Sequence, residues 1–482
     1  MSTNNARTSS QDVVHTADIV RHGDKIVIPA SMEYPVAIEI IERMMEDEDE
    51  LIAFDEAIDC FPWEGAIAFK KALDMTFGFS GTIATPSWFG PIPPKEIAVE
   101  TGIDTKVMVP WGRFTFALGT KEEYLQAGTT EKDGRVIFAV RGVIKKKWKS
   151  TIAELATLTR EIFRKESIYR GKAVRINFTD DDNVVEQIPT PKFIDLRGVD
   201  LGEMVYTEEL TRLIETNVMT PLRHTAAVRA SKIPLKRGVL LAGPYGTGKS
   251  LLARAVAKVG TDNNWTFIYI KDAGELPHAI KFAVQYQPAV IFAEDVDRHV
   301  TGGRTAAMDQ ILNTLDGIDT KSSELMVVLT TNHLEQINKA MLRPGRLDVI
   351  LNVVPPDAEA VERLVRVYAR GKIDESTDLT RVGELMAGYT PAIIREVVER
   401  AKLATITRTG TADADIAGVD IETSAATMVQ QQTLLADKPV EQASWADGMV
   451  RDVAGAVTGA VLAHELTKNQ LKQVKEIHTS VV

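Results

Sequence analysis

The chain has 482 residues, of which 44% are hydrophobic and 26% are charged, a composition typical of globular proteins that excludes wholesale disorder and fibrous repeats. Its formal charge of -11 disfavours a protein that works mainly by neutralising the phosphates of a nucleic-acid duplex. A single cysteine, Cys60, excludes an intramolecular disulfide framework. Since no apolar run approaches the roughly 18 residues of a membrane span, and no signal peptide opens the chain, we expect a cytoplasmic protein without membrane contact.

The N-terminal third of the chain predicts a mixed domain. Residues 1–20 lack periodicity and are expected to be a lead-in, and residues 21–185 predict an α+β domain. In its first helix, Ile38, Ile41 and Met45 share one face. The predicted helices are 36–45, 63–77 and 151–167, and the predicted strands are 106–118, 135–143 and 173–178.

Three features of this domain admit a structural or a functional interpretation. The acidic block 46–50 predicts a solvated helix end, and the basic cluster 145–149 predicts a solvated helix entrance rather than a phosphate contact. Trp88 and Phe89 lie in the Gly- and Pro-rich passage 78–94. We expect these two aromatic residues to pack against the domain rather than to serve a partner.

The middle of the chain predicts an α/β domain at residues 186–355, because short apolar strands alternate there with helices. This pattern is typical of a parallel sheet with helices on both faces. The predicted strands are 238–242, 265–270, 289–293 and 325–330. Residues 356–437 predict a small helical domain, with helices at 358–370, 378–386, 391–407 and 421–436, and residues 438–482 predict a linker and a helical tail.

A phosphate-binding loop is the strongest chemical signal. It reads Gly243-Pro244-Tyr245-Gly246-Thr247-Gly248-Lys249-Ser250, follows a predicted strand and begins a helix at Leu251. Glycines let the backbone curl around phosphate oxygens, and the helix N-terminus adds positive potential. We expect Lys249 to contact the terminal phosphates and Ser250 to bind Mg²⁺.

Polar residues follow two further strands of the same predicted sheet. Glu294, Asp295 and Asp297 cluster after the strand 289–293, and Thr330-Thr331-Asn332 ends the strand 325–330. Carboxylates at this sheet edge can hold Mg²⁺ and orient an attacking water. Downstream, Arg343 and Arg346 offer two guanidinium groups suited to a transferring phosphoryl group.

These motifs, in this order, resemble the AAA family of ATPases that carries a second region of homology. The resemblance covers about Phe193 to Ala404 and includes the segments Phe193 to Gly198, Pro221 to His224, Lys236 to Leu241, Asn313 to Gly317 and Met341 to Asp348. It implies an AAA+ core with a helical lid. It also implies that Glu294 and Asp295 are the Walker B acids, Asn332 is sensor 1, and Arg343 and Arg346 are arginine fingers that act on a neighbouring subunit in a ring, most often a hexamer.

Two departures from the family pattern qualify this resemblance. The Walker B order is Glu294 then Asp295, which places the shorter acid at the water-orienting position. The mitochondrial Rieske-protein AAA translocase subgroup has a similar order, and the core resembles that subgroup without its membrane anchor. The second departure concerns the segment after the second predicted strand, where ring unfoldases of the family carry a pore loop followed by a helix. Only eleven residues separate Leu276 from Pro288 there, and we expect Tyr269 to be a strand residue rather than a pore residue.

The resulting prediction is an Mg²⁺-dependent ATP hydrolase that remodels or transports a protein client. The sequence motif His464-Glu465-Leu466-Thr467-Lys468 lacks a second zinc-binding histidine, which excludes a His-Glu-x-x-His metalloprotease site. Two alternatives remain open. The Glu-Asp order leaves open a nucleotide-gated assembly scaffold with little turnover, and the basic cluster 145–149 is the only feature that supports a nucleic-acid remodeller.

Overall fold

The computed structural model describes residues 19–22, 25–29, 31–116, 122–178, 188–297, 323–337, 341 and 345–436. The chain divides into two compact units, Met1–Val354 and Pro355–Val482. The sequence predictions for residues 1–18, for the tail 438–482, for the segment 313–317 and for Arg343 fall outside the described residues.

A seven-stranded sheet forms the C-terminal half of the first unit, in the order β11-β10-β13-β14-β15-β12-β16. All neighbouring pairs are parallel except β10 and β11. The strands are β10 (Ala173–Arg175), β11 (Lys192–Phe193), β12 (Arg237–Ala242), β13 (Thr266–Ile270), β14 (Ala289–Ala293), β15 (Leu325–Thr331) and β16 (Val349–Asn352). This is the predicted α/β fold.

Two hydrophobic cores cover the two faces of this sheet, because successive strand residues point to opposite sides. In β12, Leu240 belongs to one core, whereas Val239 and Leu241 belong to the other. Helix α8 (Leu276–Ala283) contributes to the first core and helix α7 (Lys249–Asp262) to the second. The second core also contains residues of α4 (Glu208–Ile214), the π-helix η4 (Glu215–Met219) and α5 (Thr220–Arg223).

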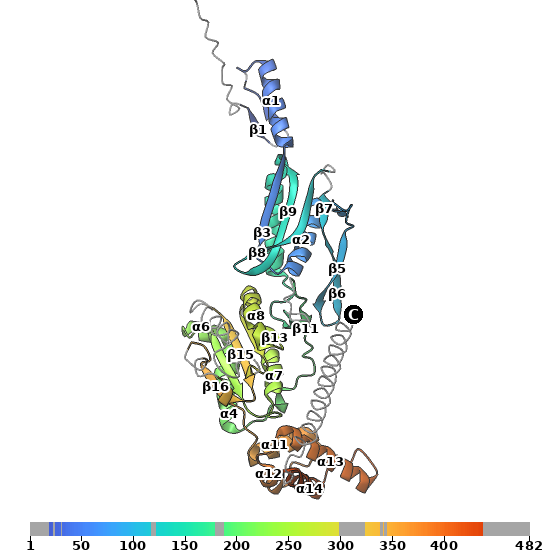
Figure 1. Cartoon of the computed structure of the whole chain (residues 1–482), viewed down its shortest axis with the longest axis vertical. Helices are drawn as coiled ribbons and strands as arrows, with labels where there is room; N and C mark the ends of the chain where they lie inside the picture. The colour runs from blue at the N-terminus through green and yellow to red at the C-terminus, as the bar shows by residue number, and fades with distance from the viewer. Residues whose placement is uncertain are drawn as a thin grey trace, which may run out of the picture. The chain divides into compact units, whose positions relative to one another are not determined.

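The N-terminal half of this unit is built on a five-stranded antiparallel sheet, in the order β3-β9-β8-β7-β4. Helices α2 (Pro62–Phe77) and α3 (Lys149–Lys165) pack together beside it, and β5 and β6 form a separate hairpin (Figure 1). The strands are β3 (Leu51–Ile58), β4 (Ser80–Ile83), β5 (Lys95–Gly102), β6 (Thr105–Trp111), β7 (Arg113–Phe116), β8 (Tyr124–Lys132) and β9 (Arg135–Lys145). The remaining elements are β1 (Val20–His22), β2 (Lys25–Val27), α1 (Tyr34–Asp49), η2 (Lys146–Trp148) and α6 (Thr225–Ala230).

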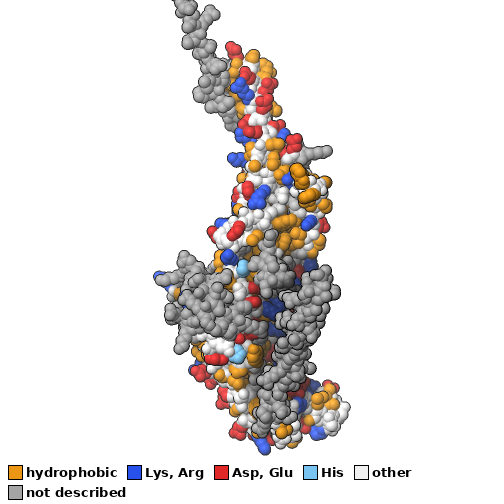
Figure 2. All heavy atoms as spheres, in the orientation of Figure 1, with side chains coloured by type: hydrophobic (Ala, Val, Ile, Leu, Met, Phe, Trp, Pro, Cys, Tyr) orange, Lys and Arg blue, Asp and Glu red, His pale blue; other side chains and the backbone are white. Residues whose placement is uncertain are grey.

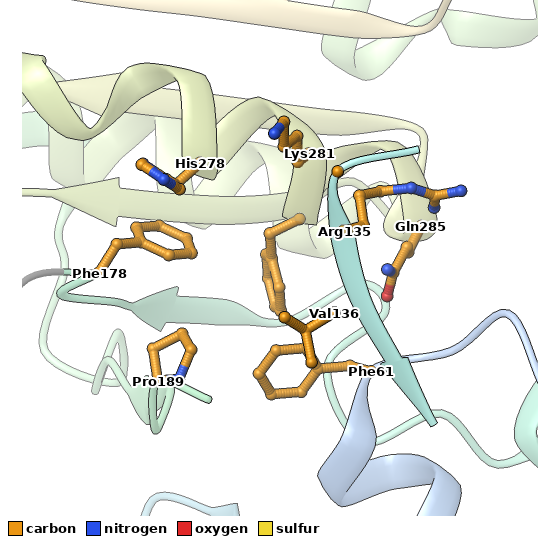
Figure 3. Close-up of a pocket in the computed structure, with 10 residues that line it drawn as sticks. Phe61, Arg135, Val136, Phe178, Pro189, His278, Lys281 and Gln285 are labelled. Atoms are coloured by element: carbon orange, nitrogen blue, oxygen red, sulfur yellow. The ribbon is translucent and has the colours of Figure 1, made fainter. Parts of the chain in front are cut away.

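The two sheets of the first unit share one hydrophobic core. Phe61, before α2, packs edge-on against Phe282 of α8, with ring centroids 5.1 Å apart. Phe61 and Val136 also face Phe178 and His278 across a cavity of about 100 Å³ (Figure 3). The N-terminal domain therefore packs against helix α8, which covers one face of the seven-stranded sheet.

A buried carboxylate lies at the same junction. Glu64 of α2 accepts hydrogen bonds from the Ser167 hydroxyl at 2.7 Å, from the backbone N–H groups of Ile168 and Tyr169 at 2.6 and 3.2 Å, and from the Tyr286 hydroxyl. Tyr286 belongs to the short helix η6 (Val284–Tyr286), which follows α8. Burial raises the pKa of Glu64. The carboxyl group links the N-terminal domain to the segment that precedes β14.

Strand β10 belongs to the seven-stranded sheet, although its residues lie within the predicted N-terminal domain 21–185. It pairs in parallel with β13, with Ala173 opposite Phe267. The predicted boundary between residues 185 and 186 thus falls between β10 and β11, which are neighbouring strands of one sheet. The change in composition marks the polar connection between β10 and β11. It does not reveal that β10 already belongs to the sheet of the following domain.

The acidic and basic clusters of the N-terminal domain, both predicted to be solvated, pair with each other. Lys145 and Lys147 lie 3.1 and 2.7 Å from Asp49, and Lys146 forms an ion pair with Asp47. Lys147 and Lys145 hold the pKa of Asp49 below its ordinary value. These ion pairs leave the basic cluster less able to bind phosphates, in agreement with the prediction that it is not a phosphate contact.

Several apolar side chains of this domain are exposed to solvent. Ile38 and Met45 of α1 face solvent, because the helix buries Ala37 and Ile40 instead. Trp88 and Phe89 do not pack against the domain, and their exposed fractions are 95% and 96%. The expectation of aromatic packing in the passage 78–94 was wrong.

The second unit is helical, as predicted. Its helices are α11 (Ala358–Ala369), α12 (Thr380–Met386), α13 (Pro391–Thr409) and α14 (Gly418–Ala436). Asp357 caps the first of them by accepting a hydrogen bond from the Ala360 N–H at 2.8 Å. Among the residues that the structure describes in both units, none of the helices is long and apolar enough to cross a bilayer.

Candidate functional site

A glycine-rich loop joins the buried strand β12 to the N-terminus of α7. Gly246 and Gly248 adopt positive φ angles of 77° and 102°, a conformation that favours glycine. Gly243 lies so close to the backbone of Val353 that an added Cβ would be 2.2 Å from the Val353 carbonyl oxygen. Thr247 is buried and donates a hydrogen bond to the Pro244 carbonyl at 2.9 Å. The loop therefore has the tight curvature that its sequence predicted.

Lys249, the first residue of α7, folds back over this loop. Its ammonium group donates to the carbonyl oxygens of Gly243 and Pro244 at 2.6 and 2.8 Å and to Oδ1 of Asn332 at 2.8 Å. Burial lowers the pKa of Lys249, although nearby carboxylates oppose this effect. The cation thus connects the loop to the end of β15.

Glu294 follows β14 and faces the start of α7. Its Oε1 accepts a hydrogen bond from the Ser250 hydroxyl at 2.9 Å, and its Oε2 accepts one from the Tyr269 hydroxyl at 2.9 Å. Burial and the hydrogen bond to Glu294 raise the pKa of Tyr269 to about 12, so the phenol remains a donor at neutral pH. Tyr269 is a residue of β13, as expected.

Asp295 and Asn332 contact each other across the ends of β14 and β15. The Asn332 side-chain amide donates to Oδ1 of Asp295 at 3.0 Å, and the Asp295 backbone N–H donates to the Thr330 hydroxyl at 3.0 Å. Asp295 has a φ angle of 48°, a left-handed conformation that is uncommon outside glycine. Asn332 therefore lies between the Lys249 ammonium and the Asp295 carboxylate, and it contacts both.

A second layer of polar residues supports this cluster. Asp297 is buried and accepts hydrogen bonds from the Thr331 hydroxyl at 2.8 Å and from the Asn332 backbone N–H at 3.2 Å. The Tyr206 hydroxyl donates to the Gly248 carbonyl at 3.0 Å. The sequence predicts no separate role for Asp297 and does not predict the contacts of Tyr206 and Tyr269. Tyr269 could have been noticed because it lies near the C-terminal end of a parallel strand, where ligands bind.

Arg346 lies far from this cluster, at a distant position along the sheet of its own chain. Its carbonyl packs over Gly238, near the start of β12, where an added Cβ would be 1.7 Å from the oxygen. Gly238 is five residues before Gly243, which corresponds to about 16 Å along a strand. The structure therefore brings together Lys249, Ser250, Glu294, Asp295 and Asn332, but not Arg346.

The assembled groups suit a nucleotide phosphate bound with Mg²⁺. Helix α7 presents its N-terminus at the glycine loop, where backbone N–H groups and the helix dipole favour an anion. The Ser250 hydroxyl and the Glu294 carboxylate offer the oxygen ligands that Mg²⁺ prefers. Phosphate-bound Mg²⁺ is typically held by one or two protein groups, so this donor set fits the ion.

Comparison with known proteins agrees with this geometry. Residues 239–354 match the model of the ATPase family associated with various cellular activities (AAA). The chain contains an AAA ATPase domain. The matched region begins in β12, includes the glycine loop and both polar strand ends, and finishes after β16.

Three curated relatives share this region. The chain is 31% identical over 246 residues to a Cell division cycle protein 48 homolog of Archaeoglobus fulgidus, covering 46% of this chain and 32% of that protein. It is 29% identical over 239 residues to the 26S proteasome regulatory subunit 8 homolog of Schizosaccharomyces pombe, covering 45% and 57%. It is 30% identical over 230 residues to the ATP-dependent zinc metalloprotease FtsH of Mesoplasma florum, covering 44% and 34%. The chain thus spans between about a third and somewhat over half of the length of these relatives.

Proposed function

We propose that this protein is a ring-forming, Mg²⁺-dependent ATPase that couples ATP hydrolysis to the remodelling or translocation of a protein client. The observation that carries the proposal is the hydrogen-bonded series from Lys249 through Asn332 to Asp295. It lies within an AAA domain and beside the Ser250–Glu294 pair.

The glycine loop, from Gly243 to Leu251, would hold the phosphates of ATP. Lys249 would exchange its present carbonyl acceptors for phosphate oxygens, which are stronger acceptors because they are charged. Ser250 and Glu294 would hold Mg²⁺ and its water shell. Bound Mg²⁺ would neutralise charge that develops on the phosphoryl oxygens.

Asp295 and Asn332 would orient the water that attacks the terminal phosphate. A carboxylate that accepts a hydrogen bond from the water holds its oxygen toward phosphorus. Asn332 donates to Asp295 and accepts from Lys249, so it fixes the distance between the water-orienting acid and the phosphate-binding cation. Arg343 and Arg346 would stabilise negative charge in the transition state.

The position of Arg346 favours action in a neighbouring subunit. The residue packs near the start of β12, about 16 Å along the strand from the glycine loop of its own chain. An arginine side chain does not span that distance, so a role at phosphate requires the site of a second copy. This argument supports a closed ring, in which each subunit completes the site of the next.

Protein clients are favoured by the relatives and by the charge pattern. Two of the relatives are named as a proteasome regulatory subunit and a metalloprotease, which are names that concern proteins. The nucleic-acid alternative depended on the cluster 145–149, and three of its lysines are paired with acids of the same domain.

A nucleotide-gated scaffold remains the second candidate, because one observation favours it. Asp295 is one bond shorter than glutamate, has an uncommon φ angle of 48° and is held by Asn332. Such an acid could bind its neighbours well and orient water poorly. In that case ATP binding would set the geometry of the assembly without steady turnover.

The test is ATP turnover by the purified oligomer and by Asp295→Asn, Arg346→Ala and Lys249→Ala variants. We expect each variant alone to lose at least about 100-fold in kcat or in nucleotide binding. Arg212→Ala is a matched control, because this arginine is 75% exposed and lies outside the site. Its turnover should equal that of the parent.

Mixing two inactive variants tests the shared site directly. A Lys249→Ala subunit still carries Arg346, and an Arg346→Ala subunit still carries an intact glycine loop, so mixed rings should regain turnover. Turnover that stays absent in the mixture would refute completion by a neighbour. A parent that binds ATP and assembles without hydrolysing it would support the scaffold in place of the ATPase.

A further inference from the structure

The passage between β4 and β5 forms a closed turn that exposes two aromatic side chains. Thr85 and Ile92 exchange two backbone hydrogen bonds of 2.8 Å, and the Gly90 N–H donates to the Ser87 carbonyl at 3.1 Å. At the tip, Trp88 and Phe89 are 95% and 96% exposed. We name residues 85–92 the aromatic turn. Since its backbone is already ordered, its side chains can bind at a low entropic cost.

The sequence on both sides of the aromatic turn carries no charge. The 20 residues between Asp74 and Lys95 include no Asp, Glu, Lys, Arg or His, in a chain that is 26% charged. Contiguous exposed apolar residues mark interaction sites on soluble proteins, and tryptophan is enriched among the residues that dominate binding energy. Figure 2 shows hydrophobic side chains gathered over the part of this domain that carries β5 to β7.

An apolar groove lies on the same domain, between α2 and β6. It has a volume of about 350 Å³. Two of its apolar lining residues, Val107 and Met108, are exposed by 44% and 54%. The other lining residues are Ile67, Lys70, Lys71, Asp74, Met75, Val109 and Pro110. We name this feature the α2–β6 groove.

The aromatic turn and the groove have complementary chemistry and are both uncovered in one copy of the chain. The turn does not fill the groove of its own chain, because its two aromatic side chains are almost fully exposed and do not line the groove. Most side chains that line the groove are apolar, and its two lysines are paired with acids, Lys70 with Asp74 and Lys71 with Glu166. A head-to-tail contact between two copies would cover both surfaces at once.

The surface area that this contact would bury is that of a supplementary interface, one that strengthens an assembly already held by another contact. An aromatic side chain buries about 150–250 Å², so two of them and the groove surface that they cover amount to about 600–1,000 Å². A stable interface usually buries about 1,200–2,000 Å². The contact is therefore too small to hold two copies alone and needs a second interface between the same copies. Repeated head-to-tail contacts close into a ring when the rotation permits.

We propose that Trp88 and Phe89 of one copy insert into the α2–β6 groove of a neighbouring copy and join the N-terminal domains around the assembly. The inference rests on the ring of the proposed function and adds a contact outside the ATPase domain. It assigns the exposed aromatic pair to a second copy of this chain rather than to a client or a lipid surface.

Cysteine cross-linking of the full-length chain tests the contact. The native Cys60 is buried, so introduced cysteines are the reactive thiols. Trp88→Cys protein is mixed with Met75→Cys, Val107→Cys or Met108→Cys protein and oxidised. We expect covalent heterodimers in at least one mixture and none from Trp88→Cys alone. Met45→Cys is the matched control, because Met45 is 61% exposed on the same domain and lies outside the groove.

A Trp88→Ser, Phe89→Ser double variant provides a second readout. We expect its half-assembly concentration, measured by sedimentation, to rise at least about tenfold while nucleotide binding is unchanged. The contact is refuted if the parent is oligomeric and all three mixtures lack heterodimers. It is also refuted if the double variant assembles like the parent but loses binding to an unfolded protein or a lipid vesicle. A monomeric parent refutes the ring and the contact together, whereas cross-links without ATP turnover refute only the ATPase.

Discussion

Replacing Glu64 tests whether one buried carboxyl group holds the N-terminal domain on the ATPase domain. The carboxylate accepts four hydrogen bonds, from Ser167, Ile168, Tyr169 and Tyr286. In Glu64→Ala, the Tyr169 N–H and the Tyr286 hydroxyl belong to fully buried residues, so water does not replace the lost acceptor. At about 1–3 kcal/mol for each unsatisfied donor, the variant should lose about 2–6 kcal/mol of stability.

Glu64→Gln separates the lost acceptor from the lost volume. The amide keeps one carbonyl oxygen and the size of the side chain, so we expect a loss of only about 1 kcal/mol. Hydrogen exchange of the peptides 62–77 and 276–286 measures the effect on both sides of the junction. Glu154→Gln, on the exposed side of α3, is the control and should exchange like the parent. Equal exchange rates in the alanine, glutamine and control variants would refute the reasoning.

The same carboxyl group should make the junction sensitive to pH. Burial raises the pKa of Glu64, so the folded protein binds its proton more tightly than the unfolded chain does. A raised folded-state pKa contributes stability that is complete below the unfolded-state pKa, about 4.3, and is lost as the pH rises through the folded-state pKa. Relative to Glu64→Gln, the parent should therefore lose stability as the pH increases above about 4.3. A constant difference between the two proteins would contradict this.

Three further changes probe the nucleotide site. Gly243→Ala would place a Cβ 2.2 Å from the Val353 carbonyl oxygen, so the loop must shift, and nucleotide binding measured by fluorescence titration should weaken at least about tenfold. Tyr269→Phe removes a hydrogen bond to Glu294 and should raise the Mg²⁺ concentration needed for half-maximal turnover about tenfold, which a metal titration of ATPase rate will show. Asn332→Ala breaks the link from Lys249 and should lower kcat about 10- to 100-fold while nucleotide affinity stays within about threefold of the parent; unchanged kcat would argue against its role.

The sequence predicted the parallel sheet well, because four of its strands are continuous apolar runs buried on both faces. It failed where strands are short or interrupted. Strands β11 and β16 have only two and four residues and carry too little pattern to detect. The predicted strand 106–118 is two strands of different sheets, because Gly112 adopts a φ angle of 138° between β6 and β7.

The location of the candidate site was predictable, but its internal contacts were not. Carboxyl ends of parallel strands meet at one edge of a sheet, and this places Glu294 and Asn332 near Lys249. Which acid contacts which neighbour depends on backbone angles such as the positive φ of Asp295, and these leave no sequence pattern. The pairing of Lys147 with Asp49 could not be predicted for a different reason, because the two residues are 98 positions apart in the sequence.

Strand β10 has a consequence for how this protein can be divided. A chain that begins at residue 186 would lack β10, and the backbone groups of β13 that pair with it would become an open strand edge, a surface prone to pairing with other chains. The same cut would uncover the apolar face of α8, where Phe282 now contacts Phe61. The isolated ATPase portion should therefore be poorly soluble. In an exchange of N-terminal domains between related proteins, β10 would have to stay with the seven-stranded sheet of the recipient protein.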